Sequence, residues 1–154
     1  MRIQRLTPIA VQHRKDWLRT GSATVEFAIV LPVFLLLLGA IIEFGQGYMI
    51  EHSLSNAARR GARKAVLPGT TNTIVESLVK THCVNTLKVA AGDVTVGIKV
   101  TKPGGGQSSS LASAQTGDAC EITVTVPFSK AGASFFLKLL GGKNLSSTCT
   151  LERE

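Results

Sequence analysis

A single carboxylate, Glu26, lies near the start of an apolar run that continues to Ile42. An ionised side chain near the middle of a bilayer costs on the order of 3 kcal/mol on insertion scales. Because Glu26 is close to the beginning of the run, its side chain can reach toward the polar interface, and the cost is smaller there. Two interpretations follow: Glu26 is a tolerated interfacial carboxylate, or it is a charge that awaits a cationic partner.

The remaining reactive residues do not form a recognisable catalytic set. His82 and Cys83 are adjacent, but no second Cys-His pair has ligand spacing, so we expect a histidine packed at a helix edge. The glycine-rich stretch 103–110 lacks the Lys-Ser/Thr of a phosphate-binding loop and predicts a flexible linker. The acidic residues beyond residue 70 are scattered: Glu76, Asp93, Asp118, Glu121, Glu152 and Glu154. These patterns predict a protein that is not an enzyme and that has no metal site, cofactor or small-molecule substrate.

Cys83, Cys120 and Cys149 are an odd set of cysteines. If this part of the chain lies outside the cytoplasm, one pair can form a disulfide, and the sequence leaves all three pairings open. The alternative is that all three are small, buried, apolar side chains.

The elements that position these residues begin with the apolar run from Phe27 to Ile42, which only Pro32 and Gly39 interrupt. With its flanks it supplies about 20 residues at ~1.5 Å each, enough for a hydrocarbon core of ~30 Å. A cleavable secretory signal has a shorter apolar core and an A-x-A-like site, and no such site follows this run. We therefore expect a retained transmembrane helix.

Five basic residues precede the apolar run and four follow it closely, so charge alone only slightly favours a cytoplasmic N-terminus. The helix should continue to about residue 66 and end before Pro68 and Gly69. A basic leader (1–21), a stem helix (22–66) and a small extracytoplasmic head (67–154) would then make up the chain.

The predicted head consists of one helix and three strands. An apolar stripe indicates a helix from Asn72 to about Val89, capped by Thr71 or Asn72. Alternating apolar residues predict strands at 93–102, 120–128 and 145–152, with a short helix or apolar loop between the last two. The expected fold is therefore α+β: a long N-terminal transmembrane helix stem followed by one helix on a three-stranded antiparallel sheet.

The formal net charge of +7 does not indicate a nucleic-acid-binding protein. The leader alone contributes +4, and the later basic cluster, "RRGARK" at residues 59–64, is not interleaved with aromatic residues. We expect this cluster to be a solvated helix face.

The stretch "GSATVEFAIVLPVFLLLLGAIIEFG", residues 21–45, closely resembles the TadE-like family of minor pseudopilins from the tight-adherence (Flp) pilus systems of bacteria. The features that carry the resemblance are a basic leader, a Gly-x-x-x-x-Glu-Phe start and an apolar segment that contains Leu-Pro. "AARRGAR" at residues 57–63 and the final "TCTLERE" are also similar to family sequences.

The resemblance implies a structural and assembly protein rather than an enzyme. Gly21 and Ser22 would flank the bond cut by a prepilin peptidase, and Glu26 would match the pilin glutamate that acts in assembly. The partners would be that peptidase, other pilin and pseudopilin subunits, and the assembly platform of the bacterial inner membrane. Pro32 would kink or loosen the helix, and Glu43 would mark the outer face of the membrane that the helix spans. The alternative is a signal-anchored envelope protein whose head is a periplasmic binding module.

Overall fold

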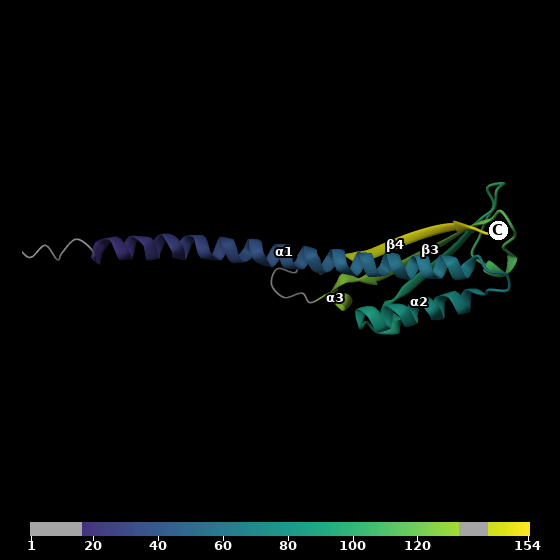
Figure 1. Ribbon diagram of the computed structural model, residues 1–154, viewed down its shortest axis with the longest axis horizontal. Coiled ribbons are helices and arrows are strands. Elements are labelled where there is room, and N and C mark those ends of the chain that lie inside the picture. The colour runs from purple at the N-terminus through teal and green to yellow at the C-terminus, as the bar shows by residue number, and fades with distance from the viewer. Residues whose placement is uncertain (1–16, 133–141) are drawn as a thin grey trace, which may run out of the picture. The chain divides into compact units, whose positions relative to one another are not determined.

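The computed structural model describes residues 17–132 and 142–154. Contacts divide the chain into two compact units, Met1–Leu38 and Gly39–Glu154, which we call the N-terminal and C-terminal units. The elements in chain order are α1 (Trp17–Ala65), α2 (Asn72–Leu87), the 3₁₀ turn η1 (Ala91–Asp93), β1 (Thr95–Thr101), β2 (Gln107–Ser108), the 3₁₀ turn η2 (Leu111–Ser113), β3 (Ala119–Pro127), α3 (Phe128–Ala131) and β4 (Asn144–Glu152) (Figure 1). Residues 1–16 of the predicted leader, and most of the predicted apolar loop before β4, lie outside the described residues.

Helix α1 runs without interruption through Pro32, in agreement with the single long helix predicted from the sequence. Because proline has no amide hydrogen, the carbonyl of Ala28 loses its usual donor four residues on. Every described side chain from Gly21 to Leu38 is exposed, and this part of α1 contains a stretch with a mean hydropathy of 2.7 that is long and apolar enough to cross a membrane. The core helix of a soluble protein would bury such a stretch, so this helix suggests a membrane anchor.

Within the C-terminal unit, α1 changes from a helix exposed all round to one with a single buried side. The buried residues recur every three or four positions, the spacing of one helix face. They are Ile50, Leu54, Ala57, Ala58, Ala62 and Ala65. Glu43 lies on the same side and is 4% exposed, so it belongs to the buried side of α1 as well as to the end of the apolar run.

The sheet has four antiparallel strands in the order β2-β1-β3-β4. The central strand β3 pairs along its length with both neighbours, with Ile122 opposite Ile98 of β1 and opposite Cys149 of β4. Alternate residues of β3 are fully buried, as the sequence predicted, and they form one face of the sheet: Cys120, Ile122, Val124 and Val126. The α+β class is confirmed, but the predicted count of three strands was wrong.

The fourth strand, β2, lies within the stretch that the sequence predicted to be a flexible linker. Its two residues pair with Val100 and Thr101 at the end of β1. A tight turn makes this return possible: the Lys102 amide donates to the Gly106 carbonyl at 2.8 Å, and the Gly105 amide donates to the Lys102 carbonyl at 2.9 Å. Gly105 has φ +86°, a conformation that glycine adopts without a steric penalty, so the glycines here form a hairpin.

Helix α2 begins at Asn72 as predicted, but its first residues are held differently. The side chain of Asn72 donates to the carbonyl of Ser109 at 2.6 Å and accepts from the amide of Leu111 at 2.9 Å. It therefore ties α2 to the loop after β2 instead of capping its own helix. The helix ends at Leu87, and the next residue, Lys88, has φ 57° and donates its amide to the Val84 carbonyl.

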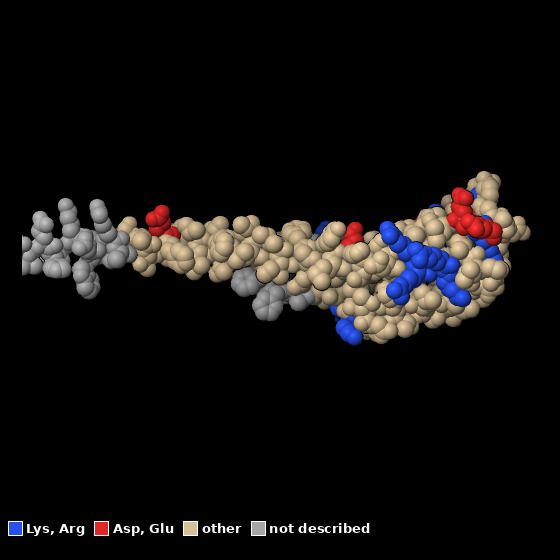
Figure 2. All heavy atoms as spheres, in the orientation of Figure 1, with Lys and Arg blue, Asp and Glu red and all other residues tan. Residues whose placement is uncertain are grey.

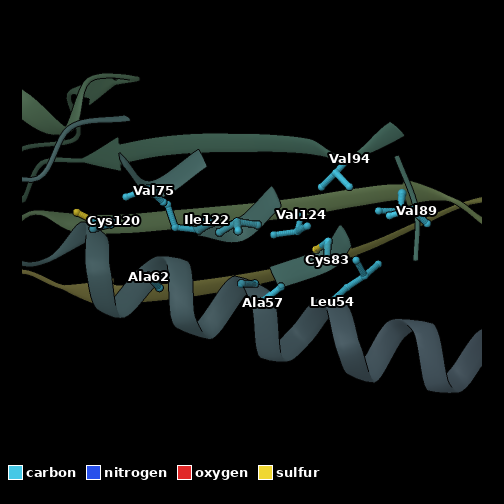
Figure 3. Close-up of a cluster of buried hydrophobic side chains, with 14 of the residues drawn as sticks. Leu54, Ala57, Ala62, Val75, Cys83, Val89, Val94, Cys120, Ile122 and Val124 are labelled. Carbon is cyan, nitrogen blue, oxygen red and sulfur yellow. The ribbon is translucent and has the colours of Figure 1, made fainter. Parts of the chain in front are cut away.

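Helix α1, helix α2 and the sheet meet at Gly61. A Cβ atom built there would lie 2.8 Å from a methyl carbon of Val79 in α2 and 3.2 Å from one of Ile122 in β3. Figure 3 shows the surrounding core, with Leu54 and Ala57 of α1 near Val124 of β3. The absence of a side chain at residue 61 lets the three elements approach this closely.

We expect Gly61→Val to destabilise the C-terminal unit by about 1–3 kcal/mol, because the added carbons overlap Val79 and Ile122. The measurement is a thermal melt of the full chain in detergent, followed by circular dichroism. Gly45→Val is the matched control, since it lies in the same helix and a Cβ there meets nothing within 4 Å. Equal melting temperatures for the two variants would contradict the close packing at Gly61.

Candidate functional site

The predicted processing residues lie close to the beginning of α1. The helix starts at Trp17, so the Gly21–Ser22 bond follows its first turn, and Gly21 and Ser22 are both exposed. The first four amide groups of a helix have no intrahelical acceptor, and helix ends fray. Extending the backbone at this bond, as a protease active site requires, therefore opens only the first hydrogen bonds of α1.

Glu26 lies four residues beyond Ser22 in the same helix. Residues at this spacing share a face and are separated by about 6 Å along the axis. The side chain of Glu26 is exposed, and so are its apolar neighbours Val25 and Phe27. The structure thus places Ser22 and Glu26 on one accessible face, with the carboxylate surrounded by apolar surface.

A second candidate site lies between α1 and α2, and sequence reasoning missed it. The end of α1 presents Arg59, Arg60, Arg63 and Lys64, and α2 presents His82 alongside them. Two adjoining hollows, of about 580 and 380 Å³, share Arg60, Arg63 and His82, and together they form one groove. We call this the basic groove. Figure 2 shows Lys and Arg side chains gathered in a patch on this part of the C-terminal unit.

The sequence contained one signal for this groove, the small residues that alternate with the cations in "AARRGARKA". The small residues are buried against α2 and the sheet, so the cations between them are left toward solvent, along the edge where α2 lies beside α1. The prediction of a solvated helix face was right about exposure. It could not include α2, whose position beside α1 is a tertiary feature.

No carboxylate neutralises the cations of the basic groove within the part of the chain that the structure describes. An ion pair within α2 joins Lys80 to Glu76, at 3.9 Å. Arg59–Arg63, Arg60–Arg63 and Arg60–Lys64 are spaced three or four residues apart, and each like-charge pair at such spacing costs about 0.2–0.5 kcal/mol. Arg63 and Lys64 lie in the last turn, where the helix dipole favours cations, but Arg59 and Arg60 lie before it.

The surroundings in the groove shift the pKa of His82, the histidine that lines it. Burial lowers the pKa of His82 below its ordinary value of 6.5, and the positive charge of Arg60 lowers it further. His82 is therefore largely neutral at pH 7 and can accept a hydrogen bond or be protonated when an anion approaches.

The three cysteines are free thiols in the structure. Cys120 faces Leu151 across the β3–β4 ladder, and Cys149 faces Ile122, so the two cysteines are diagonal neighbours. Diagonal positions are about 7–8 Å apart, beyond the usual Cα separation of a disulfide. Figure 3 shows Cys83 and Cys120 at different places along the core. In the structure Cys83 and Cys120 are buried and Cys149 is half-buried, and a disulfide between two of the three cysteines stays a prediction.

Burial also lowers the reactivity of two of these thiols. It raises the pKa of the Cys83 thiol, and it is the largest of the effects that raise the pKa of Cys120. Both therefore remain protonated and poorly nucleophilic near neutral pH. Among residues 17–132 and 142–154, no group of three or more His, Cys, Asp and Glu side chains is placed to hold a metal ion.

We expect His82 to titrate below pH 6.5 in the full chain, as measured by NMR of its ring protons. Arg60→Gln should raise this pKa only in part, because burial is the larger cause. Lys102→Gln, which removes a charge outside the groove, is the control and should leave the pKa unchanged. A His82 pKa at or above 6.5 in the unmodified protein would contradict the described environment.

The family comparison concerns the N-terminal half of the chain. Residues 21–63 match the model of the TadE-like protein family. The match begins at Gly21, includes Glu26 and Pro32, and ends within the basic cluster, so it covers most of α1 and none of the sheet. The searches of curated proteins and of solved structures each returned no match. Residues 21–63 therefore form a TadE-like segment, as the sequence resemblance predicted, and this segment indicates a protein related to the Tad pilus.

Proposed function

We propose that this chain is a minor pseudopilin, a non-enzymatic structural and assembly subunit of a tight-adherence (Flp-type) pilus or a related secretion machine. A prepilin peptidase removes the basic leader by cutting between Gly21 and Ser22. The mature protein stays in the bacterial inner membrane through α1, with the C-terminal unit outside the cytoplasm, until it joins other pilin and pseudopilin subunits at the assembly platform.

One observation carries this proposal: Gly21 and Glu26 stand at the start of an exposed apolar helix, inside the segment that matches the TadE-like family. A plain membrane anchor has no use for a carboxylate in this position, and its insertion is more favourable without one. The accessible bond after the first turn of α1 also suits a protease that must extend its substrate.

Glu26 acts in this proposal through charge neutralisation. Cleavage creates an ammonium group on Ser22, four residues from the carboxylate on the same face of α1. In a low-dielectric setting the two charges attract strongly, either within one helix or between the helices of neighbouring subunits. Pairing between subunits would fix their register, because misplaced helices leave both charges unpaired among apolar side chains.

The alternative function is a signal-anchored envelope protein whose C-terminal unit binds a partner in the periplasm. The basic groove is the observation that favours it, since a binding module needs a preformed surface. The two functions differ at Gly21, because an anchored binding protein keeps its N-terminal residues.

For processing, we expect protein recovered from cells to begin at Ser22, as determined by N-terminal sequencing. Gly21→Val should abolish this cleavage. A Cβ at residue 21 meets nothing within 4 Å, so the substitution does not disturb packing. Gly45→Val, with equally open surroundings, is the control and should be processed normally. Recovery of the unmodified protein with residues 1–21 intact would refute the pseudopilin proposal.

For assembly, we expect Glu26→Gln and Glu26→Val to be inserted and cleaved but to co-purify poorly with other pilus subunits. The reason is that neither side chain can neutralise the Ser22 ammonium of a neighbour. Crosslinking of the mature variants, beside a cleavage assay, measures the effect. Glu51→Gln, at an exposed acidic position later in α1, is the control. Normal crosslinking of both Glu26 variants would show that the carboxylate is only tolerated.

A further inference from the structure

We propose that the basic groove between α1 and α2 is a docking site for an acidic segment of a partner protein, held by carboxylate side chains on Arg60 and Arg63. This inference goes beyond the pseudopilin proposal and needs neither cleavage at Gly21 nor pairing of Glu26. It concerns a surface of the C-terminal unit alone.

The geometry of the groove fits side chains with charged ends better than it fits a small ion. Its α1 wall runs from Ser53 to Lys64, a length of about 17 Å at the rise of an α-helix. Its two hollows meet at Arg60 and Arg63, whose planar guanidinium groups bind carboxylates through paired hydrogen bonds. Leu67 and Leu78 line one hollow and are 47% and 37% exposed, so they add the apolar contact that a polypeptide, but not an ion, would use.

The charge of the groove is left for an external partner to neutralise. Within the described residues no ion pair involves Arg59, Arg60, Arg63 or Lys64, and Glu76 of α2 is engaged with Lys80. His82, which lines both hollows, can add a hydrogen bond to a bound carboxylate. Folding alone does not require this arrangement, because the buried side of α1 consists of other residues.

A membrane surface is a poorer occupant of the groove than a protein. Arg59 lies about 25 Å along α1 from Ile42, where the apolar run ends. Lipid headgroups next to the apolar run would therefore be far from the cations. Their attraction falls off within a Debye length, about 8 Å at physiological salt.

A second copy of the chain and a nucleic acid are also poorer occupants. From Gly39 onward the sequence has 12 Lys and Arg against 8 Asp and Glu, so two copies repel each other overall. Among the described residues no Phe, Tyr or Trp side chain lines either hollow of the groove, so bases lack a large aromatic surface to stack on. An acidic partner protein has neither disadvantage.

The test uses the full chain in a non-ionic detergent and a fluorescein-labelled peptide of ten glutamates as the probe. Fluorescence anisotropy should show binding that weakens as salt is raised. Arg60→Gln/Arg63→Gln should reduce the affinity at least fivefold relative to Lys102→Gln/Lys130→Gln, a control that removes the same charge at exposed positions outside the groove. Arg60→Lys/Arg63→Lys should bind with intermediate affinity, because it keeps the charge and loses the paired hydrogen bonds. Circular dichroism checks that each variant remains folded.

The proposal is overturned if the two Gln variants lose affinity equally, since net charge rather than the groove would then bind the probe. It is also overturned if the probe does not bind at low salt. Two further ligands separate the other sources of anionic groups: nanodiscs rich in phosphatidylglycerol and a ten-nucleotide oligothymidylate. Stronger Arg60- and Arg63-dependent binding of either than of the glutamate peptide would assign the groove to lipid or to nucleic acid instead.

Discussion

The C-terminal unit depends on the close approach of three elements at Gly61. A side chain there would overlap Val79 and Ile122, and the small residues on either side of it, Ala58 and Ala62, are fully buried. This packing sets how near α1 lies to α2 and to β3. The basic groove is a consequence of the same contact: when the small residues of "AARRGARKA" turn inward, the cations between them are carried to the edge that α2 shares.

Glu26 and Glu43 show how one helix treats carboxylates in two different settings. Glu26 is exposed, and the part of α1 around it is apolar and exposed on every side. Glu43 is 4% exposed, and it lies on the side of α1 that continues into the core. In the sequence the two residues stand at the two ends of one apolar run. Only the folded structure shows that the Glu26 side chain is accessible and the Glu43 side chain is buried.

Much of this arrangement could be predicted from the sequence, because local patterns determine it. Alternation identified β1, β3 and β4, and the apolar stripe identified α2 to within two residues of its end. Gly21, Ser22 and Glu26 were predicted as site residues from their spacing, and the matched range 21–63 includes all three.

What the sequence could not predict depends on contacts between distant segments. Strand β2 has two residues, too few for an alternating pattern, and it exists because the turn at Gly105 returns it to β1. The predicted head did not include α1, because the sequence of α1 does not show what its small residues pack against, although their small size is what permits the packing. The groove can be recognised only once α1 and α2 are placed side by side. The diagonal placing of Cys120 and Cys149 follows from the register of β3 and β4.

The position of α1 in the core also affects the order in which the parts of the C-terminal unit can fold. The contacts of α1 with α2 join neighbouring segments of the chain, so they close short loops and can form early. The packing of α1 on β3 at Gly61 joins segments far apart in the sequence, as does the placing of α1 and α2 on the sheet that β3 forms with β4. These contacts must wait for most of the polypeptide to be made. Until then, the buried sides of α1 and α2 have only each other to cover them. The growing chain therefore passes through a stage with exposed apolar surface, when chaperones would bind it most readily.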